Sequence, residues 1–200
     1  MSSREKILKE IAQNKPSPVP LPLPFVGSNN METGLLEKFM QVLHSIGGKG
    51  ILVDDLNEVQ NFLQQQIAEG VEVVNCIPGL HPFNSQGYIE KEAKELEGVH
   101  TVILQGKSAI AENAAIWVTE SAMLHRALPF ICQQLVIVIH EEDIVADMHS
   151  AYAKNTIDQD GYGVFIAGPS KTADIEQSLV IGAHGPLSLQ VFILKEKSAL

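Results

Sequence analysis

Cysteine is scarce in this 200-residue sequence. Only Cys76 and Cys132 occur, and neither belongs to a C-x-x-C pair. An iron–sulfur cluster is normally held by four thiolates, so this chain cannot build one alone. Each cysteine lies in a separate apolar run, which predicts a buried free thiol.

Basic residues are also few: 14 stand against 24 acidic residues, for a net charge of −10. Such a surface is repelled by phosphodiester backbones, which argues against nucleic acid as a partner. No apolar run reaches membrane-spanning length, and the N-terminus leads into an amphipathic segment, not the apolar core of a signal peptide. We therefore expect a cytoplasmic protein that does not enter a membrane.

Two nucleotide-binding motifs are missing as well. The sequence has no G-x-G-x-x-G after a strand and no G-x-x-x-x-G-K-[ST] phosphate loop. We therefore expect no flavin, no iron–sulfur cluster and no other cofactor in the isolated chain.

The first 30 residues read as a helix followed by an extended arm. Ser2 and Glu5 have capping-box spacing, and a narrow apolar stripe follows to about Asn14. This helix either packs on a neighbouring subunit or frays. Five alternating prolines between Pro16 and Pro24 then predict an extended segment, either a linker or a polyproline recognition motif.

Residues 31–200 predict one α/β domain. Short apolar runs alternate with segments of helical period, which is typical of a three-layer α/β/α fold with a mostly parallel sheet. The run 135–139 has no alternation, which predicts burial on both faces. The strands are expected near 51–53, 71–76, 101–104, 135–139, 164–167 and 189–194, and the helices near 35–46, 55–70, 88–96 and 141–152.

The most informative stretch is Phe165-Ile-Ala-Gly-Pro-Ser-Lys-Thr-Ala-Asp-Ile-Glu176. It predicts a strand, a Gly168-Pro169 turn and the N-terminus of a helix, where free backbone N–H groups favour an anion. Ser170 and Thr172 either hold that anion or cap the helix. Lys171 adds positive charge, but Asp174 and Glu176 oppose a phosphate.

A second cluster, Gly182-Ala-His-Gly-Pro186, precedes the last apolar run. His184 is either a general acid or base, or a side chain that locks the turn. Glu112 is the other candidate, because a carboxylate that interrupts an apolar run is costly unless it is paired or functional. Glu112, Asp174 and His184 could together bind a metal, although no ligand spacing demands it.

The two clusters together resemble the LUD-domain family. The resemblance implies a fold similar to the ribose-phosphate isomerase and CoA-transferase group. It also implies a role in oxidising L-lactate to pyruvate, beside separate iron–sulfur and dehydrogenase-like partner proteins.

Two further sites resemble family patterns. Residues 112–115 resemble E-T-G-T or E-S-G-T, but Asn113 replaces the hydroxyl residue, and Ala114 and Ala115 replace the glycine and the threonine. Glu112-Asn113 also resembles the E-N-G of CoA transferases, where the glutamate is a nucleophile; otherwise Glu112 is a buried carboxylate bonded to backbone or to Arg126. Arg126-Ala-Leu-Pro129 resembles the family's R-x-L-P.

We expect the candidate residues to converge at the carboxyl ends of adjacent strands, where open α/β sheets bind ligands. The candidate catalytic residues are Glu112, Asp174 and His184. The candidate ligand-binding residues are Gly168, Ser170, Lys171, Thr172 and Arg126. Three functions stay open: a non-redox component of a lactate-oxidising system, a stand-alone enzyme acting on a small anion such as an acyl-CoA or a sugar phosphate, and a sensor or scaffold.

Overall fold

The computed structural model describes residues 2–17, 19–20, 33–83, 87–155, 161–175 and 178–195, without the side chains of 173–175, 178 and 179. Most of the predicted proline arm lies outside these residues. The helices are α1 (Ser3–Gln13), α2 (Leu35–Ser45), α3 (Leu56–Ala68), α4 (Leu128–Ile131) and α5 (Met148–Lys154). Three short 3₁₀ helices cover Ala93–Leu96, Glu120–Ala122 and Glu141–Asp143.

A five-stranded sheet forms the centre of the domain, in the order β1-β11-β6-β3-β2. Its strands are β1 (Lys49–Val53), β2 (Val73–Asn75), β3 (Thr101–Gln105), β6 (Gln134–His140) and β11 (Ser188–Leu194). All four pairings are parallel. The predicted α/β fold with a mostly parallel sheet is therefore confirmed.

Strand β6 lies in the middle of this sheet and is buried on both faces, as its unbroken apolar run predicted. Leu135, Ile137 and Ile139 join one hydrophobic cluster. Val136 and Val138 join another cluster on the opposite face. This alternation divides the core into two layers, one on each side of the sheet.

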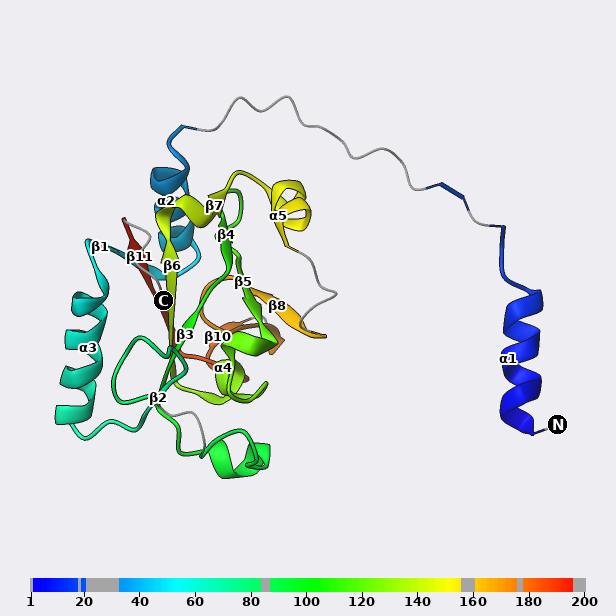
Figure 1. Cartoon of the computed structure of the whole chain (residues 1–200), viewed down its shortest axis with the longest axis horizontal. Coiled ribbons are helices and arrows are strands. Elements are labelled where there is room, and N and C mark those ends of the chain that lie inside the picture. The colour runs from blue at the N-terminus through cyan, green and yellow to red at the C-terminus, as the bar shows by residue number, and fades with distance from the viewer. Residues whose placement is uncertain are drawn as a thin grey trace.

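Different elements cover the two faces (Figure 1). Helix α3 packs on one face through Val59 and Leu63. Helix α2 packs on the other through Phe39 and Leu43, together with a second sheet of order β7-β4-β5-β8. The strands of this second sheet are β4 (Ser108–Ile110), β5 (Ile116–Thr119), β7 (Ile144–Val145) and β8 (Gly163–Ile166).

One strand was predicted in the central sheet but lies in the second sheet. The run near 164–167 is β8, which pairs antiparallel with β5 in the second sheet and not with the central strands. An apolar run of four residues has the same pattern in either sheet, so its period does not identify the neighbouring strand.

Two predicted helices are also wrong. Within 88–96 only Ala93–Leu96 is helical, as a 3₁₀ turn. The segment 141–152 is interrupted by β7, which pairs with β4, and its helix begins only at Met148. The predicted helices at α1, α2 and α3 are confirmed. At α3, Asp55 caps the helix, but Glu58 accepts from the N–H of Asp54.

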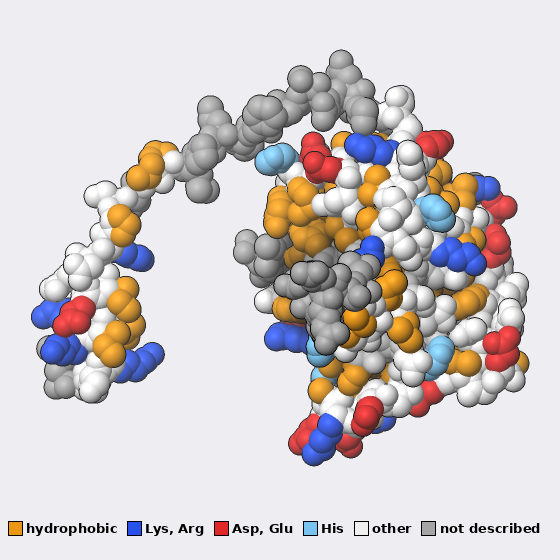
Figure 2. All heavy atoms as spheres, turned by 180° about the vertical axis from the view of Figure 1, so that it is seen from behind, with side chains coloured by type: hydrophobic (Ala, Val, Ile, Leu, Met, Phe, Trp, Pro, Cys, Tyr) orange, Lys and Arg blue, Asp and Glu red, His pale blue; other side chains and the backbone are white. Residues whose placement is uncertain are grey.

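Helix α1 forms through the predicted capping box between Ser2 and Glu5. None of its residues is buried, and its hydrophobic side chains gather along one side (Figure 2). Ile7, Leu8 and Ile11 are each more than half exposed. No helix among the described residues is long and apolar enough to cross a membrane.

Candidate functional site

The central motif folds as a hairpin and does not begin a helix. After β8, Gly168 adopts a φ of 74°. Strand β9 (Lys171–Ile175) then pairs antiparallel with β10 (Ser178–Ile181), with Thr172 opposite Val180. The predicted helix N-terminus at Ser170 is therefore wrong, and no helix dipole is available there to hold an anion.

The two motif clusters contact each other through their backbones. The N–H of Ser170 donates to the carbonyl of Pro186 at 2.9 Å, and the N–H of Gly182 donates to the carbonyl of Ser170 at 3.0 Å. A Cβ on Gly185 would lie 2.9 Å from the Cβ of Ser170, so only glycine allows this approach. The double motif is thus one structural unit. Lys171 is exposed, and the side chain of Asp174 lies outside the described residues.

His184 lies in an exposed loop beside a pocket of about 490 Å³, here called the His184 pocket. The N–H of Leu187 donates to the carbonyl of Gln133 at 2.8 Å, which places this loop at the amino ends of β6 and β11. The pocket is lined by Phe130, Ile131, Cys132, Gln133, Gly182, Ala183, His184, Gly185 and Leu187.

Glu112 occupies the turn between β4 and β5 and is exposed, so the prediction of a carboxylate within the sheet core is wrong. Its Oε2 accepts from the N–H of Met148 at 3.3 Å. This contact lies beyond the carboxyl end of β6, whereas the His184 loop lies at the amino end. Glu112 and His184 do not converge on one pocket.

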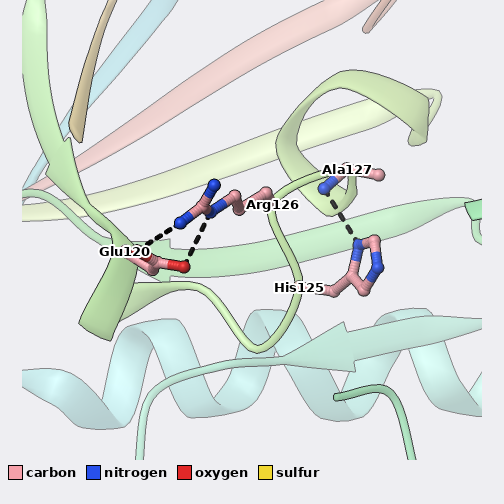
Figure 3. Close-up of polar contacts among 4 residues, drawn as sticks. All are labelled: Glu120, His125, Arg126 and Ala127. Atoms are coloured by element: carbon pink, nitrogen blue, oxygen red, sulfur yellow. Dashed lines mark hydrogen bonds and ion pairs between the residues drawn. The ribbon is translucent and has the colours of Figure 1, made fainter. Parts of the chain in front are cut away.

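Arg126 is exposed and binds Glu120, not Glu112 (Figure 3). Its Nε and Nη2 donate to the two carboxylate oxygens at 2.7 and 2.9 Å. Hydrogen bonding to Glu120 raises the pKa of the guanidinium, and the ring of Tyr162 lies 5.0 Å away. Beside it, Nδ1 of His125 accepts from the N–H of Ala127 at 3.0 Å, which fixes the approach to α4.

A different pocket, of about 400 Å³, lies at the carboxyl ends of β2 and β3. We call it the carboxyl-end pocket. It is lined by Cys76, Pro78, Phe83, Gln105, Gly106, Lys107, Thr119, Ser121, Ala122 and Leu124. The sequence analysis did not predict this pocket. A glycine and a lysine directly after the strand 101–105, Gly106-Lys107, could have indicated a binding site there.

The family model for the LUD domain matches residues 80–194. This range includes both motif clusters and most of the residues that line the carboxyl-end pocket. The chain belongs to the LUD domain family.

Curated relatives carry the name lactate utilization protein C. The protein from Bacillus pumilus is 26% identical over 121 residues, which cover 58% of this chain and 50% of the relative. The protein from Exiguobacterium sp. is 33% identical over 95 residues, or 44% of this chain and 41% of the relative. The chain thus spans about half the length of the curated relatives it matches.

A solved structure agrees on the fold. The crystal structure of a DUF162 family protein from Deinococcus radiodurans is similar with a TM-score of 0.59 and 18% identity. The match covers 80% of this chain and 96% of that chain. The finer likeness to the CoA-transferase group stays a prediction.

The LUD-domain chain holds both of its cysteines as free, buried thiols, as predicted. Burial raises the pKa of Cys76 to about 11 and that of Cys132 to about 12. Both thiols are therefore protonated near pH 7 and are weak nucleophiles. Among the described residues no three His, Cys, Asp or Glu side chains are grouped to hold a metal ion.

Proposed function

We propose that this LUD-domain chain is a non-redox component of a lactate-utilisation system that acts with iron–sulfur partner proteins in the oxidation of L-lactate to pyruvate. The observation that carries the proposal is the family match over 80–194, together with relatives named lactate utilization protein C. The number of cysteines supports a non-redox role, because two thiols are too few to hold an iron–sulfur cluster and such clusters would lie on other chains.

Growth on L-lactate tests the pathway role. A strain of the source organism that lacks this chain is expected to grow normally on glucose but poorly on L-lactate, and the full chain restores growth. A tagged chain purified under anaerobic conditions is expected to bring iron-containing proteins with it. Normal growth of the deletion strain on L-lactate would remove the proposal.

The His184 loop is the part of the family motif that a substitution can test. His184→Ala is expected to lower growth on L-lactate without changing the thermal midpoint, because the side chain is exposed. His149→Ala, at another exposed histidine, is the matched control. A lower thermal midpoint in His184→Ala alone would assign the residue a purely structural role.

The second candidate function is a stand-alone enzyme or sensor for a small anionic ligand. The carboxyl-end pocket favours it, because open α/β sheets bind ligands at that edge and a lysine lines the pocket. Mass spectrometry of small molecules released from the purified native chain tests this candidate. An anion recovered in stoichiometric amount supports it, and a chain recovered without any ligand counts against it.

A further inference from the structure

The carboxyl-end pocket differs in charge from the pockets beside α2 and α3. Among the described residues its lining includes Lys107 and no carboxylate, in a protein with a net charge of −10. The pocket beside α2 contains Glu37, Glu141 and Glu142, and the pocket beside α3 contains Glu58. Among the described residues, Lys107 forms no ion pair, so its ammonium group is available to a ligand.

Hydrogen bonds fix the backbone at Lys107. The N–H of Gly106 donates to the carbonyl of Val138 at 2.9 Å, and the N–H of Lys107 donates to the carbonyl of Trp117 at 2.8 Å. A Cβ on Gly106 would lie 2.5 Å from the Cγ2 of Ile116, so the chain here is tightly packed. The backbone of this two-residue connection between β3 and β4 is therefore held in place, and the exposed side chain of Lys107 extends from it.

Hydroxyl groups lie on the same pocket. Thr119 is buried, and its hydroxyl lies 2.9 Å from the hydroxyl of Ser121. Two hydroxyls carry two protons, and their mutual hydrogen bond uses one. The other proton is left to donate to a ligand oxygen. Gln105 adds an amide that both donates and accepts.

The rest of the wall is apolar, and this limits the ligand. Phe83, Leu124 and Ala122 line the pocket together with Pro78 and the neutral thiol of Cys76. A sugar phosphate would leave its hydroxyls against this wall without partners, which is costly. A single cation matches one negative charge, and the apolar wall matches a hydrocarbon tail.

We infer that the carboxyl-end pocket binds an organic monocarboxylate with an apolar tail, its carboxylate on Lys107 and the Thr119–Ser121 hydroxyl pair. The inference deepens the second candidate function and is independent of the pathway role. It assigns Lys107, Thr119 and Ser121 as ligand-binding residues, and none of the three is among the candidates predicted from the sequence.

Calorimetric titration of the full chain tests the assignment with four probes: hexanoate, L-lactate, glucose 6-phosphate and inorganic phosphate. Hexanoate is expected to bind most tightly, and binding should weaken with added salt. Lys107→Met is expected to weaken hexanoate binding at least about tenfold, and Ser121→Ala about threefold. Lys107→Arg keeps the charge and is expected to retain binding within about threefold.

Lys49→Met is the matched control, because Lys49 is an exposed lysine that lines a different pocket. It is expected to leave hexanoate binding unchanged. Circular dichroism and the thermal midpoint check that each variant is folded. No measurable binding of hexanoate, tighter binding of either phosphate probe, or equal losses in Lys107→Met and Lys49→Met would overturn the assignment. Growth of the deletion strain on L-lactate tests the pathway role separately. Mass spectrometry of the native chain tests whether it binds any small anion. Failure of the monocarboxylate assignment is therefore distinguishable from failure of either candidate function.

Discussion

At the scale of single residues, Ala114 has an unusual backbone conformation. Its φ is 55°, and it is the one non-glycine residue with a positive φ among those described. The turn holds it there: the N–H of Ala114 donates to the carbonyl of Ile110 at 2.8 Å. The family pattern that residues 112–115 resemble has glycine at this position, which adopts such a φ without strain.

Replacing Ala114 by glycine separates this strain from other effects. Ala114→Gly and Ala115→Gly each lose a buried methyl group and add chain entropy, but only the first relieves a left-handed backbone. We therefore expect Ala114→Gly to destabilise the protein less, by a difference of about 1–2 kcal/mol in the free energy of unfolding. Urea denaturation of both variants measures it. Equal losses would show that Ala114 is unstrained.

The two thiols predict a loss of stability in alkali. Burial raises the pKa of Cys76 to about 11 and that of Cys132 to about 12, from the usual 9.0. Above pH 9 the unfolded chain releases these protons before the folded chain does. The free energy of unfolding is therefore expected to fall by roughly 1.4 kcal/mol per thiol and pH unit between pH 9 and about 11.

Denaturation at several pH values checks this slope. The control is the double variant Cys76→Ala, Cys132→Ala, which is less stable at pH 7 but lacks both titrating thiols. Its free energy of unfolding should decline less steeply above pH 9. If the free energy of unfolding fell equally steeply with pH in both proteins, the two thiols would not be the cause of the loss of stability.

At the scale of elements, the hairpin β9–β10 shows how a local pattern can mislead. Ile175, Leu179 and Val180 have helical spacing, yet the segment pairs as two short strands. Its backbone is anchored by the bonds between Ser170 and the Gly182–Pro186 loop. Tertiary hydrogen bonds of this kind override the weak preference of a short segment.

Helix α3 offers a test of an element boundary that the sequence did predict. The carboxylate of Asp55 accepts from the N–H of Asn57 at 2.8 Å. Asp55→Ala is expected to cost about 1 kcal/mol in the free energy of unfolding. Asp54→Ala, which removes an exposed ion pair to Lys195, is expected to cost less. Thermal denaturation ranks the two variants, and the reverse order would disprove the cap.

At the scale of the whole molecule, the candidate sites lie at two edges of one sheet. The His184 pocket lies at the amino ends of β6 and β11, and the carboxyl-end pocket at the opposite ends of β2 and β3. The family motif and the proposed ligand site are therefore separate. A substitution at one edge can be interpreted without disturbing the other.

Helix α1 contributes no buried surface, so we expect it to be dispensable for folding. A chain without residues 2–14 should keep its thermal midpoint within about 1 °C. Phe39→Ala, at a fully buried position of α2, is the contrast and should cost about 3–5 kcal/mol. Differential scanning calorimetry compares the three proteins. A drop of several degrees in the truncated chain would mean that α1 packs on the domain.

The sequence by itself determined the features that depend on local pattern. Ser2 and Asp55 begin helices at the expected residues, because a cap needs only its own first turn. The run 135–139 predicted a doubly buried strand, because apolar residues on both faces exclude solvent from both. Two isolated cysteines in apolar runs likewise predicted buried thiols.

Only the tertiary structure decided which segments meet. An apolar run such as β8 has the same sequence pattern in either sheet, so its pairing with β5 could not be predicted from the local sequence. Glu112 lies in an exposed turn because β4 and β5 pair with each other around it. The carboxyl-end pocket joins residues from 76 to 124, and their proximity follows from strand order. The period of the hydrophobic residues indicates which side chains are buried. A binding site also requires that residues far apart in the sequence become neighbours, and this depends on how distant strands pair.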